Sequence, residues 1–151
     1  MVQLPSDRAD PLGVFDELKR RLSGGKTDSS AYNQPMARIL IADDDRHLVE
    51  LLRATLDEAG YEAVSANSGL AAAALIERED FDLLILDVLM PGMSGDALAD
   101  LMHQLKPNVP VLLMTGDSGD QFVRSADLPR LRKPFSEREL VDSVRELLGQ
   151  S

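Results

Sequence analysis

Acidic side chains, a hydroxyl group and a lysine each stand directly at the end of a short apolar run. Asp43–Asp45 follow RILIA, Asp87 ends FDLLILD, Thr115 ends VPVLLMT, and Lys133 follows the stretch 128–132. Carboxylates brought together without a cation repel one another and raise their own pKa values, and Mg²⁺ is the hard cation that prefers such oxygen ligands. A hydroxyl and an ammonium beside them could bind phosphoryl oxygens, and a carboxylate can be the nucleophile that forms an acyl phosphate.

The composition narrows the chemistry and the partners. The 151 residues include no cysteine and two histidines, so disulfides, thiolate zinc sites and cysteine nucleophiles are excluded and a soft metal is disfavoured. The net charge of −10 would repel nucleic acid and anionic lipid, so direct nucleic-acid binding is not expected. We find neither a secretory signal nor an apolar stretch long enough to cross a membrane, and therefore expect a cytoplasmic protein.

Apolar, strand-like runs alternate with amphipathic, helix-like segments from residue 38 onward. This alternation predicts βαβ units and a five-stranded, doubly wound parallel sheet. Ligands bind such sheets at the carboxyl ends of the strands, where the polar residues described above are found. Asp87 is the expected nucleophile because it ends the central strand. The strands are expected at 38–42, 61–66, 81–87, 109–115 and 128–132, and the helices at 46–59, 68–78, 95–105 and 137–148.

Residues 1–36 have a different character and are interpreted as an N-terminal extension to a domain at 37–149. The segment 24–35, GGKTDSSAYNQP, is rich in turn-forming residues and predicts a flexible linker. Before it, apolar residues recur at helical spacing and predict a short amphipathic helix at about 11–23. The sequence leaves open whether that helix packs on its own domain, frays, binds a partner or forms a dimer.

The four motifs IADDD, LLILDVLMPGMSG, VLLMTG and LRKPF, in this order, resemble the receiver domains of two-component response regulators. The resemblance covers about residues 37–149. It implies a flavodoxin-like (βα)5 fold with strand order 2-1-3-4-5. It also implies that the chain takes a phosphoryl group from a phosphohistidine and signals by protein–protein contact, as a single-domain regulator, a shuttle or a phosphate sink.

The resemblance assigns a magnesium site to the first and third strand ends. Asp87 would be phosphorylated and would also contact the metal. Asp44 would bind Mg²⁺ directly, Asp43 would act through a water molecule, and Leu89 would add its backbone carbonyl.

The resemblance also assigns the groups that bind the phosphoryl oxygens and the partners that supply them. Thr115 would donate a hydrogen bond to one oxygen and Lys133 would form an ion pair with another, and Lys133–Pro134 would be a cis peptide bond. The donor would be a sensor histidine kinase or a histidine phosphotransfer protein, and a further, unnamed protein would read the signal. The chain would be no conventional enzyme: it would catalyse its own phosphorylation, with slow autodephosphorylation left open.

Two departures from the receiver pattern leave a second function open. Arg130 stands where the family usually has an aromatic switch residue, and the stretch 116–129 is short by about one helical turn. A receiver-like interaction module that acts without phosphorylation is therefore the alternative.

A flavodoxin-like cofactor binder is disfavoured because the loop after the first strand is triply acidic. An aspartyl-phosphate hydrolase is ranked low because Val88 and Leu89 follow Asp87, where a second acid is needed.

Overall fold

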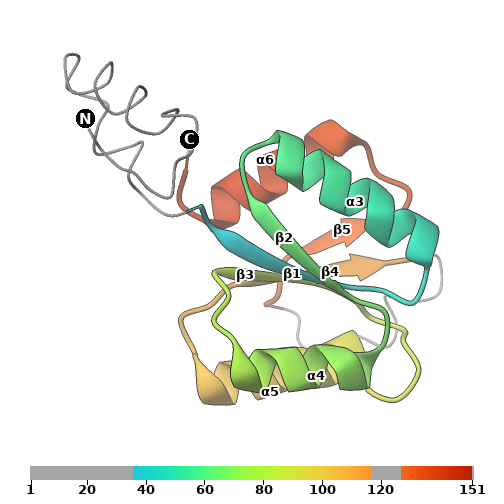
Figure 1. The fold of residues 1–151 in the computed structure, drawn as a ribbon, viewed down its shortest axis with the longest axis vertical. Coiled ribbons are helices and arrows are strands. Elements are labelled where there is room, and N and C mark those ends of the chain that lie inside the picture. The colour runs from blue at the N-terminus through green and yellow to red at the C-terminus, as the bar shows by residue number, and fades with distance from the viewer. Residues whose placement is uncertain (1–35, 117–126, 151) are drawn as a thin grey trace, which may run out of the picture. The chain divides into compact units, whose positions relative to one another are not determined.

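The computed structural model describes residues 36–116 and 127–150. Five strands within these residues form one parallel sheet with order β2-β1-β3-β4-β5. Helices α3 and α6 cover one face of the sheet, and α4 and α5 cover the other (Figure 1). This arrangement confirms the predicted doubly wound, flavodoxin-like fold. The strands are β1 Arg38–Ala42, β2 Glu62–Ala66, β3 Leu83–Asp87, β4 Val111–Thr115 and β5 Arg130–Arg132, and the helices are α3 Arg46–Glu58, α4 Gly69–Arg78, α5 Gly95–Leu105 and α6 Glu137–Leu147.

The core lies on both sides of the sheet because successive strand residues point to opposite faces. In β1, Ile39 and Ile41 pack towards α3 and α6, whereas Leu40 and Ala42 pack towards the opposite helices. Every residue of β3 and β4 is buried. The continuous apolar runs in the sequence are thus explained by strands that are covered on both faces.

Local signals place the helix starts that follow the strands. Asp45, Ser68 and Ser94 cap α3, α4 and α5. The Asp45 side chain accepts hydrogen bonds from two backbone N–H groups of the first turn, and the Ser68 and Ser94 side chains accept one each. Ser136 and Glu139 form a capping box at the start of α6. These caps set where each loop at the carboxyl edge ends and its helix begins.

Four strands begin later than the sequence pattern predicts: β2 by one residue, and β3, β4 and β5 by two residues each. Proline explains the differences in β4 and β5. β4 begins at Val111 instead of residue 109, directly after Pro110, and β5 begins at Arg130 instead of residue 128, directly after Pro129. Proline has no N–H to donate to a sheet, so regular pairing starts with the next residue. The predicted helix at 11–23 and most of the short stretch 116–129 lie outside the described residues.

Candidate functional site

The register of the sheet brings the four strand ends to one point. Ala42 is paired with Leu86, so Asp43 emerges beside Asp87. Asp87 is paired with Met114, which places Thr115 one residue further along the next strand. Thr115 is paired with Arg132, and the Lys133 backbone N–H donates a hydrogen bond to the Thr115 carbonyl at 2.7 Å.

Three carboxylates form what we call the acidic triad: Asp43, Asp44 and Asp87. One oxygen from each lies within 4.8 Å of the other two. Asp43 is almost completely buried, with 1% of its surface exposed, and Asp87 is also buried, whereas Asp44 is exposed. The triad therefore has a closed side against the sheet and an open side towards solvent.

Lys133 supplies positive charge to the buried side of the triad. Its Nζ atom lies 2.8 Å from Asp43 Oδ2 and 3.5 Å from Asp87 Oδ1. Burial by itself lowers the pKa of the Lys133 ammonium, but the hydrogen bond to Asp43 and the two carboxylate charges outweigh burial and raise the pKa above its ordinary value. The Lys133–Pro134 peptide bond is cis, as the resemblance implies.

Asp87 has an unusually high pKa for an aspartate. Burial and the nearby charge of Asp43 raise the pKa of its carboxyl from 3.8 to about 6, against the opposing effects of Lys133 and of a hydrogen bond from the Leu89 backbone. A cation placed in the triad would favour the ionised carboxylate. The Lys133 ammonium therefore offsets only part of the repulsion between the carboxylates of the triad.

The Asp43 carboxylate also organises the loop after β1. Its Oδ1 atom accepts a hydrogen bond of 2.9 Å from the Asp45 backbone N–H, while Oδ2 accepts from Lys133. Asp45 in turn caps α3, accepting from the backbone N–H groups of His47 and Leu48. The three consecutive acids therefore have three different environments: Asp43 is held in the interior, Asp44 faces solvent, and Asp45 ends the loop.

The Thr115 hydroxyl is buried without a hydrogen-bond partner. The residue is 1% exposed, and its Oγ1 atom contacts no donor or acceptor within the part of the chain that the structure describes. An unsatisfied buried hydroxyl costs free energy unless it is used by a ligand or by ordered water. Its position at the end of β4, next to Asp87 in the sheet register, suits a bound oxygen-rich group.

Two residues that follow β3 lie close to Asp87: Leu89 in the loop and Gly95 at the start of α5. Leu89, two residues after Asp87, has a side chain that is 46% exposed. Gly95 begins α5 against the Asp87 backbone, where an added Cβ would lie 2.3 Å from the Asp87 carbonyl oxygen. Sequence patterns placed Gly95 in a motif but gave no reason for it; the close packing of α5 on β3 supplies that reason.

The donor set fits a hard divalent cation. The acidic triad offers carboxylate oxygens only, as Mg²⁺ prefers, and Lys133 lies within ion-pair distance of Asp43 and Asp87. Thr115 is placed at the neighbouring strand end by the sheet register. The two histidines are exposed on α3 and α5 and are not members of the triad.

Comparison with known proteins identifies the family. A family model described as the response regulator receiver domain matches residues 39–145. The chain belongs to this family. The receiver is 43% identical over 119 residues to the response regulator protein FleR of Pseudomonas aeruginosa, covering 76% of this chain and 25% of FleR. It is 33% identical over 117 residues to the response regulator receiver protein CpdR of Brucella abortus, covering 75% of this chain and 98% of CpdR.

Solved structures support the same fold. A CheY-like receiver domain protein from Methanospirillum hungatei has a TM-score of 0.70 at 30% identity, covering 76% of this chain and 95% of that one. The receiver domain of a sensor histidine kinase from Pseudomonas aeruginosa has a TM-score of 0.70 at 22% identity, covering 77% of this chain and all of its own, and that structure contains a magnesium ion in its active-site cleft. At this identity the second likeness concerns the fold alone.

The receiver matches only part of the length of two of these relatives. It spans 25% of FleR and 51% of the transcriptional regulatory protein CpxR of Klebsiella pneumoniae. In the ranges 36–116 and 127–150, no helix has the length and apolar character needed to span a membrane.

Proposed function

We propose that Asp87 is the phosphoacceptor of this receiver and takes a phosphoryl group from a phosphohistidine on a partner protein. The observation that carries the proposal is the Lys133 ammonium, which lies 2.8 Å from Asp43 and 3.5 Å from Asp87 on the buried side of the acidic triad. The Thr115 hydroxyl at the next strand end supports it, because it is buried and has no hydrogen-bond partner among the residues that the structure describes. These groups match the negative charge that a transferred phosphoryl group carries on its equatorial oxygens.

The triad would hold Mg²⁺ through Asp44 and Asp87 directly and through Asp43 by way of water, with the Leu89 carbonyl as a further ligand. When bound, the ion supplies positive charge to the carboxylates and to the phosphoryl oxygens. Asp43 is buried and already bonded to Lys133 and to the Asp45 N–H, which suits an indirect role. Asp44 is exposed, which suits direct contact with an ion that enters from solvent.

In the proposed step, an Asp87 carboxylate oxygen attacks the phosphorus atom in line with the phosphohistidine P–N bond. The new O–P bond forms as the P–N bond breaks, and its electron pair returns to the imidazole nitrogen of the donor. Lys133 and Thr115 bind two of the oxygens of the transferred group, and the receiver contributes positioning instead of acid–base chemistry. Hydrolysis of the acyl phosphate by water would complete a slow autodephosphorylation.

The same proposal includes the biological setting. The donor would be a sensor histidine kinase or a histidine phosphotransfer protein in the cytoplasm, and the readout would be contact with a further protein. The net charge of −10 supports protein partners over direct binding to nucleic acid. Residues 1–36 would be an extension to the receiver domain at 37–149.

Phosphoryl incorporation tests the proposal. Purified protein incubated with Mg²⁺ and phosphoramidate is expected to gain the mass of one phosphoryl group, and the gain should disappear when EDTA replaces Mg²⁺. Intact-protein mass spectrometry measures both. Failure to gain mass with phosphoramidate or acetyl phosphate would instead support the interaction module that acts without phosphorylation.

Magnesium affinity is expected to depend on pH below neutrality. Because burial and Asp43 hold the pKa of Asp87 at about 6, a cation must displace a proton from this carboxyl at lower pH. With that pKa, the dissociation constant for Mg²⁺ should be about tenfold higher at pH 5 than at pH 7. Isothermal titration calorimetry at the two pH values checks this. Equal affinities would show that Asp87 is already ionised at pH 5.

A further inference from the structure

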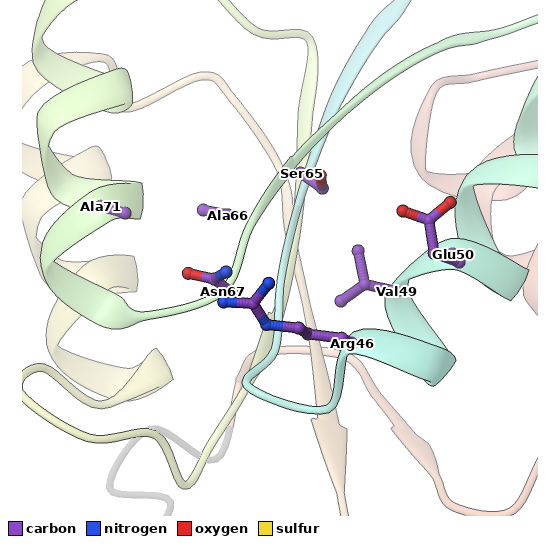
Figure 2. A pocket seen from close by; sticks show the side chains of 7 residues that line it. All are labelled: Arg46, Val49, Glu50, Ser65, Ala66, Asn67 and Ala71. Carbon is purple, nitrogen blue, oxygen red and sulfur yellow. The ribbon is translucent and has the colours of Figure 1, made fainter.

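A pocket of about 330 Å³ lies beside the edge strand β2, and no member of the acidic triad lines it. We call it the β2-edge pocket; Arg46, Val49 and Glu50 of α3, residues 65–67 at the end of β2, and Ala71 of α4 line it (Figure 2). Its volume is at the lower end of the range of small-molecule sites, about 300–1,000 Å³. Val49 and Ala66 are buried and give it an apolar floor.

Two opposite charges, those of Arg46 and Glu50, border this pocket and form no ion pair with each other. Arg46 and Glu50 are four residues apart on α3, the spacing at which helix side chains are neighbours and commonly form ion pairs. In Figure 2 the Arg46 side chain reaches across to Asn67, whereas Glu50 lies on the other side of Val49, towards Ser65. No ion pair or hydrogen bond of the Arg46 side chain is found among the described residues, and Glu50 has only a loose contact of 4.0 Å with Arg53.

The polar groups at the two ends of the pocket have different preferences. The Arg46 guanidinium presents a planar fork of donors that matches a carboxylate, and the Asn67 amide can donate to the same group. At the other end, the Glu50 carboxylate can accept from an ammonium group, with the Ser65 hydroxyl as a neighbouring acceptor. An anion alone would leave Glu50 unmatched, and a cation alone would leave Arg46 unmatched.

We propose that the β2-edge pocket binds a small zwitterion of the size of a free amino acid. Its carboxylate lies against Arg46 and Asn67, its ammonium group lies against Glu50, and its carbon atoms cover the apolar floor. The site is distinct from the acidic triad and its occupancy does not depend on phosphorylation of Asp87.

A titration of ¹⁵N-labelled full-length protein with single L-amino acids at about millimolar concentration tests the proposal by NMR. At least one amino acid should shift the backbone amides of Arg46 and Asn67 in a saturable way. Acetate and methylammonium, which each carry one of the two charges, should shift them much less. The same titration of the Asp87→Asn protein should give the same dissociation constant, which separates this site from the proposed phosphorylation.

Matched variants show where the ligand binds. Arg46→Gln and Glu50→Gln should each raise the dissociation constant by about tenfold or more. Arg138→Gln and Glu58→Gln change the same residue types in a different hollow, between α3 and α6, and should leave it unchanged. The proposal is overturned if no amino acid shifts the pocket amides, if acetate alone binds as tightly, or if the α3–α6 variants weaken binding equally.

Discussion

Asp87→Asn is expected to abolish phosphoryl incorporation and, in the absence of Mg²⁺, to stabilise the fold at neutral pH. The amide cannot attack phosphorus, so no acyl phosphate can form at this position. Burial and the charge of Asp43 hold the pKa of Asp87 at about 6, so ionising this carboxyl at neutral pH costs free energy. The asparagine amide carries no charge and avoids that cost.

The stability effect has a defined pH window. The pKa of Asp87 is higher in the folded protein than its ordinary value of 3.8, so the folded state binds more protons than the unfolded state between about pH 4 and pH 6. The contribution of this carboxyl to stability therefore falls as pH rises through that window. At pH 7.5, Asp87→Asn should raise the free energy of unfolding by up to about 3 kcal/mol, with little change at pH 4.

Urea denaturation in EDTA at the two pH values measures this difference, and mass spectrometry with phosphoramidate and Mg²⁺ measures incorporation. Asp142→Asn, which changes an exposed aspartate on α6, serves as the control and should alter neither quantity much. Incorporation by Asp87→Asn at the wild-type level would place the phosphoacceptor elsewhere. If Asp87→Asn changed the free energy of unfolding equally at pH 4 and pH 7.5, the pKa of the Asp87 carboxyl would not be raised in the folded protein.

Lys133→Gln is expected to slow phosphorylation by about a hundredfold, the usual cost of removing one group that binds developing negative charge. The glutamine can still donate a hydrogen bond but cannot neutralise a phosphoryl oxygen. It also leaves the Asp43 carboxylate, which is 1% exposed and bonded to Lys133 at 2.8 Å, buried without its cation. Breaking such a pair should destabilise the Mg²⁺-free protein by about 3 kcal/mol.

Magnesium should restore much of that stability, because a cation in the triad supplies the charge that the variant lacks. The rate of mass gain with phosphoramidate and urea denaturation with and without Mg²⁺ test the two effects together. Lys106→Gln is the matched control, since Lys106 also pairs with an aspartate, Asp80, but at an exposed position. A Lys133→Gln protein that is phosphorylated as fast as the wild type would remove Lys133 from the proposed mechanism.

Much of the fold follows from local sequence features. The alternation of strand and helix, the buried character of β3 and β4, and the capping box at Ser136 depend on neighbouring residues, so the pattern predicts them well. The sequence pattern predicted the starts of β4 and β5 two residues before their actual positions. The apolar runs include Pro110 and Pro129, but regular strand pairing begins only after these prolines. The strand order came from the resemblance, since periodicity alone does not choose among the topologies of a parallel sheet.

For the site, the sequence by itself determined which residue types stand at the carboxyl ends of the strands, because a strand followed by a polar loop is a local pattern. Only the tertiary structure decided their distances and environments. It placed Lys133 closer to Asp43 than to Asp87 and raised the pKa of Asp87 through burial and a neighbouring charge. It also left the Thr115 hydroxyl without a hydrogen-bond partner within 36–116 and 127–150. These properties arise from sheet register and from burial among residues far apart in the chain, which short-range spacing does not encode.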